Sequence, residues 1–120
     1  MTIMKASRFL KSFQFAAAGV WAAAKSEQNI RFHFLAAAVV LAAGVFSGLT
    51  YIEWLIIILL IGGMIAFEMM NSAMERIVDL ASPDLHPLAK LAKDMAAGAV
   101  LVFAAASAII GLLIFIPKWF

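Results

Sequence analysis

Long apolar stretches dominate this chain and are separated by short polar segments. Phe34 to Ile52 and Met95 to Ile116 contain no charged residue, and Trp54 to Phe67 is equally apolar until Glu68 interrupts it. A helix that spans a membrane needs about 20 predominantly apolar residues. The first and third stretches meet that length, and the second does if its helix continues past Glu68. The pattern therefore predicts three spans, at about residues 30–49, 52–80 and 88–116.

Helix-boundary signals support this division. Thr50 and Glu53 have the spacing of a capping box, in which each side chain binds a backbone N–H group at the start of a helix. The segment from Ser82 to Pro87 is rich in turn-forming residues and is expected to separate the second span from the third. Pro87 suits the first turn of the third helix. Pro117 is expected to end that helix.

Residues 1–25 are predicted to form a separate helix that lies on the membrane surface. Its apolar side would carry Ile3, Leu10, Phe13 and Val20, and its polar side Lys5, Arg8, Lys11 and Gln14. A basic amphipathic helix of this kind lies in the interface, with its charged groups near the lipid phosphates.

Composition and charge distribution indicate one integral membrane domain over residues 1–120. The chain is 66% hydrophobic with a mean hydropathy of +1.04, whereas soluble domains are about 45–50% apolar. Basic residues lie before the first span and between the second and third, and the turn between the first two spans has none. The positive-inside rule then places the N-terminus and the second loop in the cytoplasm. The predicted fold is all-α, with three transmembrane helices and an N-terminal amphipathic surface helix.

The sharpest chemical signal lies where the second span leaves the membrane. At about 100° per residue, four polar side chains of one helix fall within an arc of roughly 80°. They are Glu68, Asn71, Glu75 and Asp79. A carboxylate at the centre of a membrane helix costs about 2.5–3.5 kcal/mol, so such a group is normally used or paired. Glu68 is therefore a candidate general base for a lipid alcohol, the alternative being a structural carboxylate bound to a neighbouring helix.

Two carboxylates at the predicted membrane edge are candidate Mg²⁺ ligands. Glu27 lies just before the first span and Glu75 at the cytoplasmic end of the second. Mg²⁺ is commonly held by one or two carboxylates together with substrate phosphates. The alternative for Glu27 is a surface pair with Arg31, four residues on. Asn71 could position a phosphate, or it could form a hydrogen bond between helices.

A second polar cluster begins the third span. Lys93 is a candidate phosphate ligand and Asp94 a candidate acceptor, although Asp94 could instead pair with Lys90. His33 and His86 share no metal-ligand spacing, and each is interpreted as a polar anchor near the interface. The chain has no glycine-rich nucleotide loop, no zinc-site spacing and no nucleic-acid-binding module. Any nucleotide site must therefore be built from helix ends and charged side chains.

The two polar motifs together resemble the prokaryotic diacylglycerol kinase family. They are Glu68-x-x-Asn71-Ser72-Ala73-x-Glu75-x-x-x-Asp79 and Ala92-Lys93-Asp94-Met95. Ser82 to Lys90 and the sequence Ile52-Glu53-Trp54 look more like the undecaprenol kinase branch of that family. The resemblance implies a homotrimeric lipid kinase of the bacterial inner membrane, with ATP as co-substrate, Mg²⁺ as cofactor and active sites between neighbouring subunits.

The resemblance also implies roles for individual residues. Glu68 matches the catalytic base beside the lipid substrate, and Glu27 and Glu75 match the metal ligands. The positions implied to surround the nucleotide are Arg8, Phe15, Glu27, Asn71, Glu75, Asp79, Asp84, Leu85, His86, Lys93 and Asp94. This chain departs from the enterobacterial-type enzymes at Phe15, where they carry Tyr, and at His33-Phe34, where they carry Gln-Glu. Both departures argue against a preference for diacylglycerol.

The function expected from the sequence is ATP-dependent phosphorylation of undecaprenol at the cytoplasmic face of the membrane. Diacylglycerol remains an alternative substrate, because apolar lipid-contacting residues look interchangeable. A small proton- or ion-coupled transporter could use Glu68 as a relay, but the apolar stretches of the first and third spans contain no acid that would continue it. A non-catalytic helical scaffold would leave the polar face of the second span unexplained.

Overall fold

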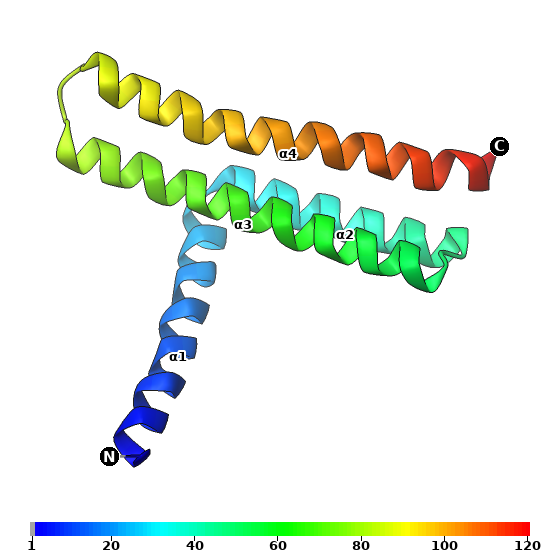
Figure 1. Ribbon diagram of the computed structural model, residues 1–120, viewed down its shortest axis with the longest axis horizontal. Helices are drawn as coiled ribbons and strands as arrows, with labels where there is room; N and C mark the ends of the chain where they lie inside the picture. Colours follow the sequence, from blue (N-terminus) through cyan, green and yellow to red (C-terminus); the bar gives the residue numbers. More distant parts are fainter. Residues whose placement is uncertain (1) are drawn as a thin grey trace.

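Four helices account for nearly all of the chain in the computed structural model, which describes residues 2–120 (Figure 1). They are α1 (Thr2–Ser26), α2 (Gln28–Ser47), α3 (Tyr51–Ala81) and α4 (Pro87–Trp119). The helix predicted over residues 1–25 and the three predicted spans correspond to these four helices in order. Met1 and the side chain of Ile3 lie outside what the structure describes.

The predicted helix starts are confirmed by their capping contacts. Glu53 N donates to Thr50 Oγ1 at 3.2 Å, and Thr50 N donates to Glu53 Oε1 at 2.9 Å, which completes the capping box of α3. Gly48 has a φ of 68° and ends α2 in the left-handed conformation that glycine adopts without a steric penalty. Pro87 occupies the first turn of α4, and His86 Nδ1 accepts from Leu88 N at 3.1 Å as its N-cap. His86 is therefore a helix cap.

Pro117 does not end α4, contrary to the expectation from the sequence. The helix runs through it to Trp119, and Phe120 N donates to Ile116 O at 3.0 Å. Proline lacks an N–H donor and its ring crowds the carbonyl four residues earlier, but its φ is close to that of a helix. The last turn of α4 accommodates it.

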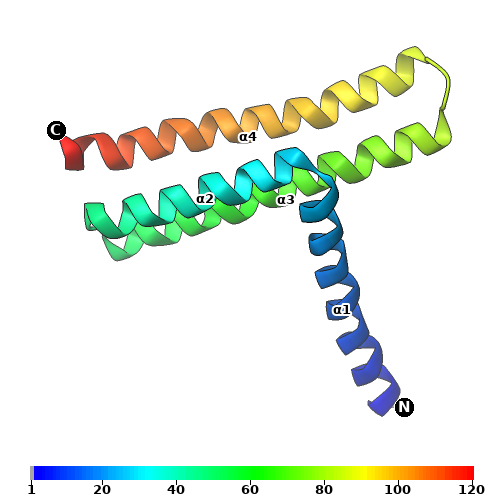
Figure 2. The same ribbon diagram turned by 180° about the vertical axis from the view of Figure 1, so that it is seen from behind.

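Helices α2, α3 and α4 form an antiparallel bundle, and α1 projects away from it (Figures 1 and 2). α3 and α4 make the longest hairpin, and α2 runs beside the half of α3 that lies away from the α3–α4 turn. The other half of α3 and the first turns of α4 extend beyond the start of α2. This extension carries most of the polar residues singled out in the sequence.

A small apolar core lies at the end of the bundle away from the α3–α4 turn. Ile57, Ile114 and Phe115 are buried there against partly buried residues of α2, α3 and α4. At the same end, Lys118 Nζ lies 2.9 Å from Glu53 Oε1, and Trp119 Nε1 donates to Ser47 Oγ at 2.7 Å. These contacts fasten the end of α4 to both helices that flank the α2–α3 turn.

Most of the apolar surface of α2, α3 and α4 remains uncovered within one chain. Each is long and apolar enough to cross a membrane, yet only 11%, 11% and 6% of their most hydrophobic windows are buried. A soluble protein rarely exposes apolar patches of this extent. The chain is therefore a multi-pass membrane protein, whose helices are covered by lipid or by other subunits.

Candidate active site

The four polar residues on one side of α3 become steadily more exposed toward the α3–α4 turn. We call them the acidic face; they are Glu68, Asn71, Glu75 and Asp79. Glu68 is 4% exposed, Asn71 and Glu75 are partly buried, and Asp79 is exposed. α3 is one continuous helix across all four positions, as the sequence required. The acidic face therefore runs from the bundle interior to an open polar end.

Glu68 has a partner that sequence spacing did not identify. His33 Nε2 of α2 lies 3.6 Å from Glu68 Oε2, and the side chains of the two residues are only 21% and 6% exposed. The sequence predicts only a polar anchor near the interface at His33. The contact joins two helices, so no spacing rule within one helix could have indicated it. The one available signal was a histidine in the first apolar helix at a depth similar to that of Glu68.

Glu27 is held by α3, and the alternative pair with Arg31 does not form. Arg76 Nη2 donates to Glu27 Oε1 and to Ser26 Oγ, each at 2.9 Å. Arg31 Nη1 instead donates to backbone carbonyls at the end of α1, those of Ala24 at 3.2 Å and Lys25 at 2.9 Å. These contacts attach the α1–α2 junction to α3 at Arg76, which lies between one and two turns beyond Asn71 and beside the acidic face.

Two lysine–aspartate pairs lie where α4 begins. Lys93 Nζ contacts Asp79 Oδ1 across the α3–α4 hairpin, and Lys90 Nζ lies 2.6 Å from Asp94 Oδ2 within α4. The alternative pairing of Lys90 with Asp94 is therefore formed. Lys93 is joined to the acidic face through Asp79. The two pairs together place positive and negative charges next to one another at this end of the site.

A cavity of about 670 Å³, lined by both apolar and charged side chains, opens at the same place. It is lined by the α3–α4 turn, including Asp84, Leu85 and His86, and by Asp79, Lys90 and Lys93. Lysine ammonium groups are suited to phosphate as point charges. The structure thus brings five of the sequence-predicted site residues, together with Lys90, around one cavity of a size that suits a small ligand.

The acidic face also contains an unsatisfied oxygen. Asn71 Nδ2 donates to Glu75 Oε1 at 3.5 Å, while Asn71 Oδ1 is buried without a hydrogen-bond partner. Oxygen donors from carboxylates and amides are those that Mg²⁺ accepts. No set of three or more acidic, histidine or cysteine side chains could hold a metal among the residues that the structure describes.

Arg8 and Phe15 are not brought to this cluster within one chain. Both lie on the part of α1 that projects from the bundle, and Phe15 is 73% exposed (Figure 2). Their predicted contact with the nucleotide is not made by the fold of a single chain.

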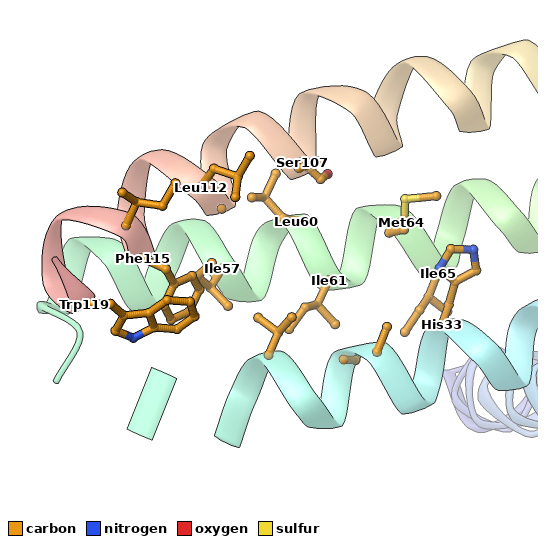
Figure 3. Close-up of a pocket in the computed structure, with 16 residues that line it drawn as sticks. His33, Ile57, Leu60, Ile61, Met64, Ile65, Ser107, Leu112, Phe115 and Trp119 are labelled. Atoms are coloured by element: carbon orange, nitrogen blue, oxygen red, sulfur yellow. The ribbon is translucent and has the colours of Figure 1, made fainter. Parts of the chain in front are cut away.

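A second, apolar cavity of about 440 Å³ begins at His33 and runs along α2, α3 and α4 toward Trp119 (Figure 3). Its lining includes Ile61 and Met64 of α3 and Leu112 of α4. Ser107 Oγ, in the wall formed by α4, is buried and has no hydrogen-bond partner. The buried carboxylate of Glu68 contacts His33, which lines one end of this apolar cavity. The cavity lined by Lys90 and Lys93 lies farther along α3, at the α3–α4 turn. The arrangement can place a lipid hydroxyl beside Glu68 and a phosphate near Lys93.

Comparison with known proteins agrees with that chemistry. The sequence profile of the family described as "Prokaryotic diacylglycerol kinase" matches residues 14–115. The chain is 56% identical to a protein of Bacillus subtilis named "Undecaprenol kinase" over 112 residues, which cover 93% of this chain and 91% of the relative. It is 37% identical to a "Diacylglycerol kinase" of Synechocystis over 113 residues, covering 93% of this chain and 65% of that protein. A "Diacylglycerol kinase" of Haemophilus influenzae is 28% identical over 96 residues, covering 80% and 81%.

The match to the family profile covers most of the chain and includes the acidic face and both lysine–aspartate pairs. The exposed apolar helices agree with the membrane location of a kinase that acts on lipids. Together with the similarity to two named kinases over nearly the whole sequence, this settles the assignment. The chain belongs to the prokaryotic diacylglycerol kinase family, whose members are lipid kinases that use ATP.

Proposed function

We propose that this protein phosphorylates undecaprenol with Mg²⁺–ATP at the cytoplasmic face of the bacterial inner membrane. The observation that carries the proposal is the position of Glu68, buried in α3 beside His33 at one end of the apolar cavity. The 56% identity to the Bacillus undecaprenol kinase supports the polyprenol over other lipid alcohols.

In the proposed reaction, Glu68 accepts the proton of the lipid hydroxyl. The lipid oxygen attacks the γ-phosphorus of ATP, a bond forms between them, and the bond from that phosphorus to the β–γ bridging oxygen breaks. ADP leaves with the electron pair, and the phosphorylated lipid remains in the membrane. Catalysis of this kind depends mainly on positioning and on neutralising charge.

The open end of the acidic face is the proposed nucleotide site. Lys93 would bind a phosphate, and the α3–α4 turn, with Asp84, Leu85 and His86, would contact the part of the nucleotide that lies farther from Glu68. Glu27, Glu75 and the free oxygen of Asn71 would hold Mg²⁺, which neutralises phosphate charge when bound. Asp79 and Asp94 would orient Lys93 and Lys90 through the ion pairs described above.

The proposed topology places the N-terminus and the α3–α4 turn in the cytoplasm, because the basic residues concentrate there. The proposed assembly is a homotrimer. It is supported by the uncovered apolar faces of the three spans and by Arg8 and Phe15, which need another subunit to meet a nucleotide site. α1 would lie on the membrane surface as an amphipathic helix.

The direct test is phosphate transfer from radiolabelled ATP by the purified protein in detergent micelles, with Mg²⁺ and either undecaprenol or diacylglycerol. Labelled undecaprenyl phosphate is the expected product. Labelled phosphatidic acid alone would assign the diacylglycerol activity, which the Synechocystis relative's name favours. Label in neither lipid, from protein that remains oligomeric, would contradict the kinase proposal and make ion transport the next assay.

A further inference from the structure

We propose that His33 is a positioning residue for Glu68: its imidazole fixes one carboxylate oxygen so that the other faces the lipid hydroxyl. The proposal rests on the proposed function, since it assigns His33 a role in that same reaction. It concerns a residue at which this chain departs from the enterobacterial-type members of its family.

The geometry of the pair is the first support. His33 Nε2 lies 3.6 Å from Glu68 Oε2, a direct contact slightly longer than a hydrogen bond, and both side chains are largely removed from solvent. A carboxylate has two equivalent oxygens, so a group that holds one of them determines the direction of the other. Side chains that orient a reacting group in this way raise the reaction rate, because fewer arrangements of the carboxylate and the lipid hydroxyl are unproductive.

The surroundings of Glu68 provide few alternative partners. α4 packs against this part of α3 through Phe103, whose ring lies 5.0 Å from that of Phe67, and residues 95–117 of α4 contain no ionisable side chain. On α2, Arg31 is occupied by backbone carbonyls of α1. Glu27 is paired with Arg76, and Glu75 with Asn71. His33 is therefore the ionisable group that the described residues place against Glu68.

The third support is the place of His33 in the apolar cavity. His33 lines the end of that cavity opposite Trp119, as Figure 3 shows, so it stands where the cavity meets the carboxylate. The rest of the lining is almost wholly apolar. A lipid chain in this cavity would bring its hydroxyl to the imidazole and to Glu68 together, and the imidazole is placed to decide which carboxylate oxygen is free.

A set of substitutions at position 33 separates positioning from packing. Gln carries a donor nitrogen at about the reach of the histidine Nε2, Asn carries one that is too short, and Phe keeps the ring without a donor. We expect His33→Phe and His33→Asn to lower kcat about tenfold or more with KM for ATP unchanged, in line with other orienting partners. His33→Gln should restore kcat to within about threefold of the original protein. Ser47→Ala removes a polar contact at the far end of α2 and should leave kcat unaltered.

A double-mutant cycle identifies Glu68 as the residue through which His33 acts. In a Glu68→Gln background, His33→Phe should cause no further loss of kcat. A tenfold loss of kcat on His33→Phe in both the original and the Glu68→Gln background would overturn the proposal. Full kcat in His33→Phe would also overturn it, and so would an effect confined to KM for the lipid. Each of those results would mean that His33 only lines the cavity and does not position Glu68.

A spectroscopic measurement tests the contact without enzyme activity. The ¹⁵N chemical shifts of the His33 ring should change when Glu68 is replaced by Gln, whereas those of His86 should not. Unchanged His33 shifts would overturn the proposal, and this measurement does not need a folded His33 variant. If the unmodified protein transferred no phosphate to any lipid, the proposed function would fail while the His33–Glu68 contact could still be confirmed or refuted.

Discussion

Arg76 and Glu27 join helices that are remote in the sequence, with Nη2 and Oε1 2.9 Å apart. The same guanidinium also binds Ser26 Oγ at 2.9 Å. The ion pair holds a proposed Mg²⁺ ligand by one of its oxygens, and it attaches the α1–α2 junction to α3. Because the two side chains are 56% and 28% exposed, the pair itself contributes little to stability. We expect the ion pair to act mainly by fixing the orientation of the Glu27 carboxylate.

Arg76→Gln should therefore weaken the response to Mg²⁺. Without the guanidinium, the Glu27 carboxylate is no longer held in one direction, and we expect the Mg²⁺ concentration for half-maximal activity to rise about tenfold. The maximal rate at saturating Mg²⁺ should be largely retained. A magnesium titration of lipid phosphorylation checks this, and coincident titration curves for the two proteins would contradict it.

Glu68→Gln should abolish most of the turnover. The amide has nearly the shape of the carboxylate but cannot accept the hydroxyl proton, so we expect a loss of about 10²–10⁴-fold in kcat. Binding of ATP, measured by equilibrium dialysis, should be unaffected. Glu53→Gln is the matched control, because Gln also satisfies a capping box at the opposite end of the bundle. Full activity of the Glu68 variant would refute its role as the base.

Glu75→Gln should change the metal dependence while preserving the fold. Gln still offers an oxygen to Asn71, so the contact of 3.5 Å between the two side chains can be retained. The negative charge is lost, and we expect half-saturation by Mg²⁺ to move to at least about tenfold higher concentration. The measurement is activity against free Mg²⁺ at constant ATP. An identical curve would exclude ligation by Glu75.

Lys93→Ala should raise KM for ATP more than it lowers kcat. The ammonium group lies at the cavity beside the α3–α4 turn and is paired with Asp79, so its removal leaves an uncompensated carboxylate facing the phosphates. We expect KM for ATP to increase about tenfold, since hydrogen bonds to charged groups contribute about 1.5–3 kcal/mol. Lys118→Ala removes an ion-paired lysine at the other end of α4 and serves as the control. Equal KM values in both variants would argue against phosphate binding by Lys93.

Gly63→Ala should destabilise the hairpin of α3 and α4. A Cβ at position 63 would lie 2.5 Å from Phe103 Cζ, whereas one at neighbouring Gly62 would meet nothing within 4 Å. Overpacking of this kind costs about 1–3 kcal/mol. Thermal unfolding in micelles should show a lower midpoint for Gly63→Ala and little change for Gly62→Ala. Equal midpoints would mean that the Phe103 ring moves aside at no cost.

The helices were predictable because their signals are local. Runs of apolar residues, the Thr50–Glu53 capping box and Pro87 each act within a few positions of the chain, and all three appear in the structure as expected. The acidic face was predictable for the same reason, since one continuous helix determines the direction of its side chains. The end of α4 at Trp119 was missed because proline disfavours the interior of a helix without excluding it.

The contacts between helices were not predictable from the same signals. His33 with Glu68, and Glu27 with Arg76, depend on how each helix is rotated about its axis and on how far it slides along its neighbour. Those quantities are set by packing, such as the close approach of Gly63 to Phe103. Spacing offered Arg31 as an alternative partner of Glu27, but the carbonyls at the end of α1 bind that guanidinium instead.

The scant burial of the three spans, 11%, 11% and 6% of their most hydrophobic windows, has a thermodynamic consequence. Most of the contacts that a soluble protein would make with itself are made here with amphiphiles or with other subunits. The free energy of unfolding is therefore a joint property of the polypeptide and the molecules around it. Changing the acyl-chain length of a detergent should shift the unfolding midpoint of an unaltered sequence as much as a core substitution does.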